Sequence, residues 1–163
     1  MPHTHHPGFD SALRVAVLTP EMTLRQILKK MRAARAIAGM VPVLRSLAEA
    51  VEAGTAALPP VEAAVVVFTG ACHGELSALE RDLFWRVFQV PVFEQLLTPD
   101  GRVIAMECDA HDGLHLLDED GPPEEYRAFL DRTPCGCGNT QPRLAGLHRI
   151  GKLRPAPVIR SAA

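Results

Sequence analysis

Three of the four cysteines in this chain fall between residues 108 and 137. Cys135 and Cys137 are separated by one glycine in the sequence PCGCG, and Cys108 and His115 flank a short polar turn upstream. Three thiolates and one imidazole form a ligand set that zinc takes in closed, tetrahedral sites. The pattern C-x6-H followed by C-x-C therefore predicts a zinc site. Because four protein ligands leave no coordination position for water, we expect this zinc to be structural.

Other ligand sets remain open from spacing alone. His111 is an alternative to His115, and Cys72 or His73 is an alternative to any one of the four. Close packing of the three cysteines in a core is another interpretation, but glycine-flanked cysteines in a loop fit a core poorly. In a variant of the metal interpretation, three residues of the polar turn support the site without binding the metal directly: Asp109, His111 and Asp112.

The segments that would position these ligands have α/β character. The run from Ala63 to Thr69, AAVVVFT, is typical of a strand that is covered on both faces. Ser77 and Glu80 form a capping box that starts a helix, and Pro91 begins a further strand, so a right-handed βαβ unit is predicted. RVIAMEC and GLHLLD then predict an antiparallel hairpin at the edge of a small mixed sheet, with Cys108 and His115 on its two arms.

The first third of the chain predicts a pair of helices. LRVAVLT is a candidate strand, Thr19 and Pro20 favour a helix start, and Gly39 and Pro42 separate this helix from a second one. We expect four segments: a disordered lead (1–10), a helical segment (11–58), a zinc-binding α/β domain (59–154) and a tail (155–163).

Composition excludes some classes of function. The chain is 47% hydrophobic and 22% charged with a formal net charge of -2, so we expect no nucleic-acid partner, and no apolar run is long enough for a membrane span. The N-terminus has no signal layout, so we expect a cytoplasmic protein whose thiols stay reduced and bind metal. One basic run is expected to be a solvated helix face: Lys29, Lys30, Arg32 and Arg35. Three N-terminal histidines are expected to be incidental: His3, His5 and His6.

Two strings carry a family resemblance, VFEQLLTPDGRVIAMECDAHDGLHLLDED and TPCGCGNTQPRLAGLHRIGKL. They resemble the middle portion of the phenylacetate-CoA ligase family of adenylate-forming enzymes, and the likeness covers roughly residues 60–152. Some members of that family hold zinc in this region. The resemblance implies four zinc ligands and selects His115 over His111: Cys108, His115, Cys135 and Cys137.

The sequence also departs from the family where the chemistry would occur. The family's Tyr-Gly-x-x-Glu motif should fall near Leu96 to Gly101, but the sequence there is LLTPDG, and neither Glu94 nor Asp100 stands in the motif's frame. The family's phosphate-binding loop and lid domain have no counterpart in these residues. We therefore expect a non-catalytic pseudoenzyme that acts as a binding or accessory protein, because such chemistry depends on charge clamping by these parts.

Two enzymatic alternatives stay open. The chain is a candidate subunit of a split acyl-CoA ligase, or it is a thiol-dependent enzyme. In the second case Cys72 would be the nucleophile, with His73 and Glu75 beside it in the turn GACHGE after a central strand. The same turn is a candidate small-molecule site. The expected partner is therefore a protein or a small molecule, and an oligomer is left open.

Overall fold

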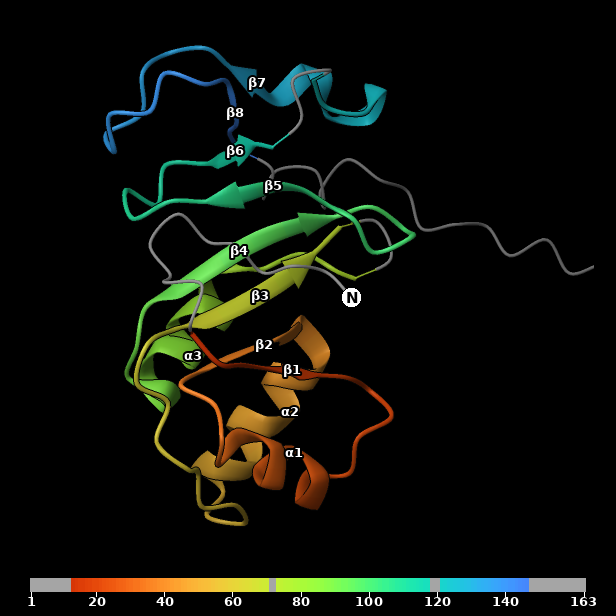
Figure 1. The fold of residues 1–163 in the computed structure, drawn as a ribbon, viewed down its shortest axis with the longest axis vertical. Coiled ribbons are helices and arrows are strands. Elements are labelled where there is room, and N and C mark those ends of the chain that lie inside the picture. Colours follow the sequence, from red (N-terminus) through yellow and green to blue (C-terminus); the bar gives the residue numbers. More distant parts are fainter. Residues whose placement is uncertain (1–12, 71–72, 118–120, 147–163) are drawn as a thin grey trace, which may run out of the picture.

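The computed structural model describes residues 13–70, 73–117 and 121–146, which share one eight-stranded mixed sheet (Figure 1). The strand order is β1-β2-β3-β4-β5-β6-β8-β7. The first four strands are parallel to one another, and every later pairing is antiparallel. The fold is therefore mixed α/β, as the sequence predicts.

We call the region from β1 to β4 the parallel half. It contains β1 (Val15–Leu18), α1 (Leu24–Met31), β2 (Ala36–Met40), α2 (Val41–Glu52), β3 (Val65–Thr69), α3 (Ala78–Phe88) and β4 (Val92–Leu97). Each strand pairs with the next one along the chain, and Figure 1 shows the three helices grouped beside these strands. The helices bury a common apolar core against the sheet, with Leu44 and Phe84 at its centre.

Helix starts follow local capping chemistry. The predicted capping box of α3 is confirmed, because the Ser77 hydroxyl accepts the Glu80 amide at 3.2 Å and the Glu80 carboxylate accepts the Ser77 amide at 2.8 Å. The predicted start of the first helix at Thr19 and Pro20 is wrong. A second capping box, between Thr23 and Gln26, starts α1 at Leu24 instead.

Strand β2 is absent from the sequence prediction. The sequence predicts that Gly39 separates two helices, but Gly39 lies in β2, which pairs with β1 on one side and β3 on the other. A Cβ atom at Gly39 would lie 3.2 Å from the Leu18 carbonyl oxygen, so the residue suits close backbone packing. The two N-terminal helices therefore alternate with strands of the common sheet.

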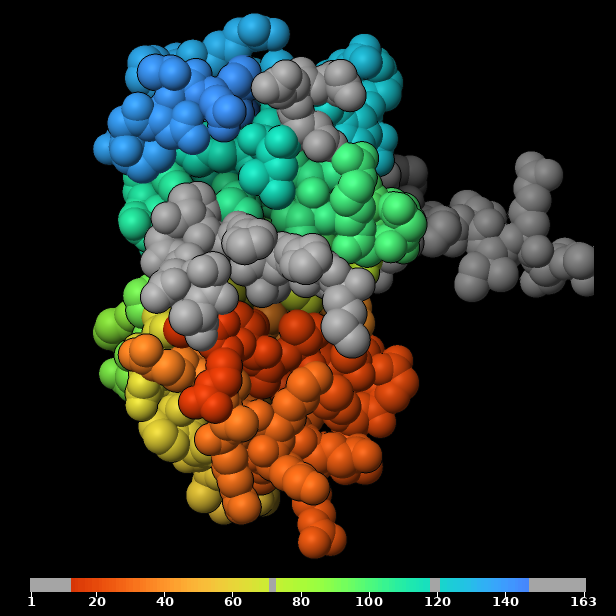
Figure 2. Space-filling model, in the orientation of Figure 1, coloured from red at the N-terminus to blue at the C-terminus, as the bar shows by residue number. Residues whose placement is uncertain are grey.

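We call the remaining region the antiparallel half. It contains β5 (Val103–Glu107), β6 (Leu114–Leu116), the 3-10 helix η1 (Glu124–Phe129), β7 (Leu130–Asp131) and β8 (Arg143–Leu144). The predicted hairpin of β5 and β6 forms, and β8 and β7 extend the sheet beyond it. Figure 2 shows the two halves at opposite ends of the molecule. Among the described residues, no helix has the length and apolar character needed to cross a membrane.

Candidate metal centre

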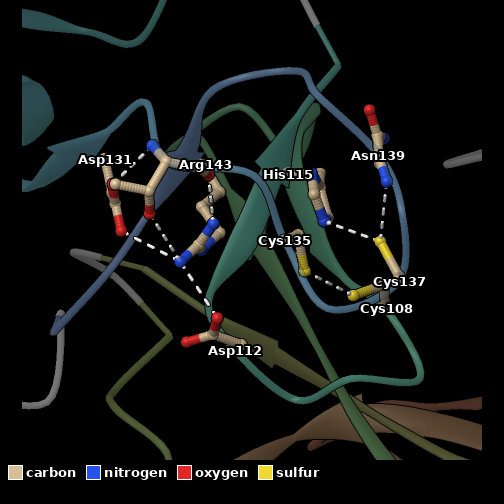
Figure 3. A network of polar contacts seen from close by, with 9 residues as sticks. Cys108, Asp112, His115, Asp131, Cys135, Cys137, Asn139 and Arg143 are labelled. Carbon is tan, nitrogen blue, oxygen red and sulfur yellow. Dashed lines mark hydrogen bonds and ion pairs between the residues drawn. The ribbon is translucent and has the colours of Figure 1, made fainter.

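The four predicted ligands converge in the antiparallel half (Figure 3). Cys108 follows β5, His115 lies in β6, and Cys135 and Cys137 lie in the loop between β7 and β8. Their sulfur and imidazole nitrogen atoms lie within 4.8 Å of one another. The four residues are therefore close enough to bind one metal ion.

The distances suit a tetrahedral cation. The sulfur atoms of Cys108 and Cys135 are 3.6 Å apart, and the Cys137 sulfur is 3.5 Å from Nε2 of His115. Around zinc, with Zn–S bonds of about 2.3 Å, tetrahedral ligand atoms lie about 3.5 to 3.8 Å apart. These two separations therefore match those between the ligand atoms of a tetrahedral zinc ion.

Tight turns place the ligands. In the hairpin, the His111 amide donates to the Cys108 carbonyl at 3.0 Å, and His111 itself has a positive φ of 50°. In the cysteine loop, the Gly138 amide donates to the Cys135 carbonyl at 2.9 Å, and Gly138 has a φ of 85°. Because glycine adopts positive φ at little cost, Gly138 lets the chain reverse directly after Cys137.

The thiols differ in their electrostatic environment. Burial raises the pKa of the Cys108 thiol to about 11. The Asn139 amide, which donates to the Cys137 sulfur at 3.4 Å, lowers the pKa of that exposed thiol. Since metal ligands must be thiolates, binding of a cation here is coupled to loss of protons.

An arginine network holds the strands beside the cluster (Figure 3). The Arg143 side chain is only 5% exposed, and its Nη2 lies 2.9 Å from a carboxylate oxygen of both Asp112 and Asp131. Its Nη1 donates to the Thr133 carbonyl at 2.6 Å. This one guanidinium connects β8 to β7 and to the hairpin turn. Spacing gave no signal for it, because a lone arginine in a short strand resembles a surface residue.

The three residues of the polar turn, Asp109, His111 and Asp112, differ in what they contact. His111 turns toward another group: its Nδ1 lies 3.1 Å from Glu107 Oε1, and its ring stacks on Phe93 with centroids 5.2 Å apart. Asp112 binds Arg143, and Asp109 is exposed. Within the described residues, the Cys/His cluster contains His115 and neither His111 nor His73.

Two of the three candidate catalytic residues lie within the described structure, and these two line different cavities. Cys72 lies outside the described residues. His73 is half-buried and lines a cavity beside α1 and α2, whereas Glu75 is exposed and lines a different cavity beside Glu94 and Glu107.

A buried polar cluster around Glu94 was not predicted. Burial raises the pKa of the Glu94 carboxyl to about 7, although the Thr69 hydroxyl donates to it at 2.7 Å. Arg81 lies nearer to Glu107, at 3.0 Å, than to Glu94, at 3.7 Å. The cluster borders a cavity of about 470 Å³ on the helix-covered side of β4. A signal existed in the sequence, since Glu94 and Glu107 are the only carboxylates in β4 and β5, two strands in which Gln95 is the only other polar residue.

No protein-family model matches the chain, and no curated protein matches it. A solved structure with a similar fold is an open conformation of 2-hydroxyisobutyryl-CoA ligase in complex with 2-HIB-AMP and CoA. The TM-score is 0.53 at 14% sequence identity, over 78% of this chain and 36% of the ligase chain. The chain therefore shares the fold of a part of an adenylate-forming acyl-CoA ligase and spans about a third of that ligase's length.

Proposed function

We propose that the protein is a zinc-stabilised binding or accessory protein related to the phenylacetate-CoA ligases, with no ligase activity of its own. The convergence of Cys108, His115, Cys135 and Cys137 carries this proposal. The coarse likeness to an acyl-CoA ligase supports the relationship, and the sequence resemblance names the family.

The ligand set favours zinc over other metals. Three sulfurs and one imidazole suit zinc, whereas magnesium and calcium prefer oxygen ligands. Four protein ligands also fill a tetrahedral shell, so the ion has no position for a reacting water. The role that fits is structural: the ion would join the hairpin of β5 and β6 to the loop after β7.

The segment from Leu96 to Gly101, where the ligase family has its Tyr-Gly-x-x-Glu motif, favours a binding role over a catalytic one. Thr98 to Gly101 form a tight turn between β4 and β5, in which the Gly101 amide donates to the Thr98 carbonyl at 2.9 Å. Asp100 is exposed at the tip of this turn, and Glu94 is directed to Thr69 and Arg81. These two carboxylates therefore serve other local contacts and offer no shared magnesium site.

The metal proposal is tested by a matched pair of histidine substitutions. Zinc content is measured by elemental analysis for the wild type, His115→Ala and His111→Ala. We expect about one zinc per chain in the wild type and in His111→Ala, and loss of zinc in His115→Ala. Loss in His111→Ala with retention in His115→Ala would show that the ligand is His111. A wild-type protein that folds fully without any metal would overturn the structural role.

The split-ligase alternative has one supporting observation, because the fold likeness covers only 36% of the ligase chain. ATP-dependent pyrophosphate exchange with a panel of aryl and hydroxy acids tests it. We expect no exchange above background with this chain alone. Clear exchange would overturn the non-catalytic role, and exchange that arises only after a second protein is added would favour a subunit. We further propose a cytoplasmic location, where the thiols would remain reduced.

A further inference from the structure

The three thiols of the candidate metal centre differ in their access to solvent. Cys108 and Cys135 are buried, whereas Cys137 is exposed. A metal ion binds cysteine as the thiolate, which is also the form that oxidants attack. With a metal bound, all three sulfurs are therefore reactive in kind, and exposure decides which of them a small oxidant reaches first. That thiolate is Cys137.

The turn that carries Cys137 leaves its surroundings open. Gly136 and Gly138, on either side of Cys137, are exposed and have no side chain to cover its sulfur. A Cβ atom placed on Gly138 would meet no other atom within 4 Å. The Gly138 amide donates to the Cys135 carbonyl at 2.9 Å, which holds Cys137 at the outside of a tight turn. A small molecule can therefore approach this thiolate from solvent.

A second thiol lies within reach of Cys137. The ligand atoms of Cys108, Cys135 and Cys137 all lie within 4.8 Å of one another, so modest side-chain motion can bring two sulfurs to the bond length of about 2.05 Å. A bridge between Cys135 and Cys137 would close a small, strained ring around the single glycine that separates them. Cys108 comes from the end of β5 and has no such restriction. Cys108 is therefore the better partner.

We propose that Cys137 is a site of oxidation by hydroperoxides, and that its oxidation replaces the bound metal with a disulfide between Cys137 and Cys108. The proposal rests on the metal centre proposed above and assigns that centre a response to oxidants.

With hydrogen peroxide the chemistry has two steps. The Cys137 thiolate attacks one peroxide oxygen: an S–O bond forms, the O–O bond breaks, and the departing hydroxide takes a proton from solvent to become water. The Cys108 thiolate then attacks the Cys137 sulfur: an S–S bond replaces the S–O bond, and the oxygen leaves with protons as a second water. The two thiolates together lose two electrons, which the peroxide gains.

The disulfide would connect the same two segments as the metal. After oxidation only Cys135 and His115 remain as ligands, so the ion should dissociate. Cys108 lies at the end of β5 and Cys137 lies between β7 and β8, so the new bond would still join the hairpin to the loop. The antiparallel half would then exchange a metal cross-link for a covalent one.

The test uses the full, zinc-loaded chain. Zinc release during treatment with hydrogen peroxide is followed with a chromogenic chelator, and disulfides are mapped by mass spectrometry of unreduced peptides. We expect release of about one zinc per chain, formation of the Cys108–Cys137 disulfide, and renewed zinc binding after reduction with a thiol. Absence of release, or release without that disulfide, would overturn the proposal.

A matched pair of variants tests the order of attack. Cys137→His replaces the exposed thiol with another zinc ligand, and peroxide should release its zinc at least about tenfold more slowly than in the wild type. Cys135→His is the control, because it keeps Cys137 and Cys108 and should release zinc at about the wild-type rate. Equal release rates in Cys137→His and the wild type would contradict attack at Cys137.

Dimedone, which reacts with sulfenic acids, gives a readout that needs no variant. Added to the wild type together with peroxide, it should label Cys137. Labelling of Cys108 or Cys135 instead would overturn the proposal.

Zinc content is measured before peroxide is added. An untreated, folded chain without zinc would reject the metal centre itself. One zinc per chain that peroxide fails to release would reject only the oxidation proposal and leave the structural metal intact.

Discussion

The parallel and antiparallel halves of the sheet share one hydrogen-bonded ladder but are stabilised by different chemistry. In the parallel half, three helices cover the strands, and all five residues of β3 are buried. In the antiparallel half, β6 has three residues, β7 and β8 have two each, and the buried apolar cluster is small. Hydrophobic burial is extensive in the first half, whereas the second half holds the Cys/His cluster and the Arg143 network.

Short strands explain this division of roles. Isolated two-stranded ribbons are marginally stable in water, and two-residue strands offer very few ladder bonds. The Cys/His cluster and Arg143 both connect the loop between β7 and β8 to the hairpin of β5 and β6. With a metal ion bound to the cluster, these long-range links would restrict the loop to one arrangement. The two halves should therefore respond differently to metal removal, to core substitution and to pH.

Metal removal should have the largest effect. A structural zinc contributes on the order of 10 kcal/mol to folding. Treatment with a chelator should abolish amide protection in β5 to β8 and preserve it in β1 to β4, as measured by hydrogen exchange with mass spectrometry. Protection should return when zinc is restored. Uniform loss across the sheet would show that the two halves form a single cooperative unit.

Truncation of a core side chain should instead destabilise the parallel half. Phe84 is fully buried between α3 and the sheet, so Phe84→Ala should destabilise the parallel half by about 3 to 5 kcal/mol. Trp85→Ala is the control, because Trp85 is 59% exposed and should change the free energy of unfolding by less than about 0.5 kcal/mol. Urea unfolding measures both. An equally large effect of Trp85→Ala would mean that α3 packs through its outer face.

Glu94 should make stability depend on pH. Its folded pKa of about 7 exceeds the ordinary value of 4.5, so the native state retains a proton that the unfolded chain loses. This contribution is fully present below about pH 4.5 and disappears as pH rises through 7, a loss of about 3 kcal/mol at roughly 1.4 kcal/mol per pKa unit.

Glu94→Gln isolates the contribution of the Glu94 proton, because glutamine mimics the protonated carboxyl and leaves the neighbouring side chains of Arg81 and Glu107 in place. Urea unfolding at pH 5, 6, 7 and 8 should show that the variant gains stability relative to the wild type as pH rises. Parallel curves for the two proteins would contradict the raised pKa of Glu94.

Arg143→Lys should have the smallest effect. Lysine keeps the charge but cannot make the forked contacts to Asp112 and Asp131, so we expect a loss of about 1 to 2 kcal/mol. Faster exchange of β7 and β8 amides should accompany this loss. Arg127→Lys, which affects an exposed pair with Glu124, should be nearly neutral. Equal effects at the two positions would contradict a special role for the buried guanidinium.

The sequence predicts the elements whose signals are local. A β-branched run predicts β3, the Ser77 capping box predicts α3, and cysteine spacing groups the four candidate ligands. Strand β2 escapes prediction because AIAGM contains only one β-branched residue and is a strand through its pairing with β1 and β3.

The surroundings of Arg143 and Glu94 likewise depend on tertiary contacts that the sequence does not show. Arg143 is buried because Asp112 and Asp131, distant in sequence, lie beside it. Glu94 acquires its raised pKa only when α3 covers β4. Periodicity cannot reveal either environment, because both depend on contacts between segments that are separate along the chain.

The sequential strand order β1-β2-β3-β4 has a consequence during protein synthesis. All four parallel strands and the three helices beside them have been made once Leu97 is added, so this half can begin to fold while the rest is still being translated. The last proposed zinc ligand, Cys137, emerges later, and β8 follows it. Metal capture would then be a late step on an already folded platform, and zinc shortage would leave a nascent chain with its C-terminal part open to proteases.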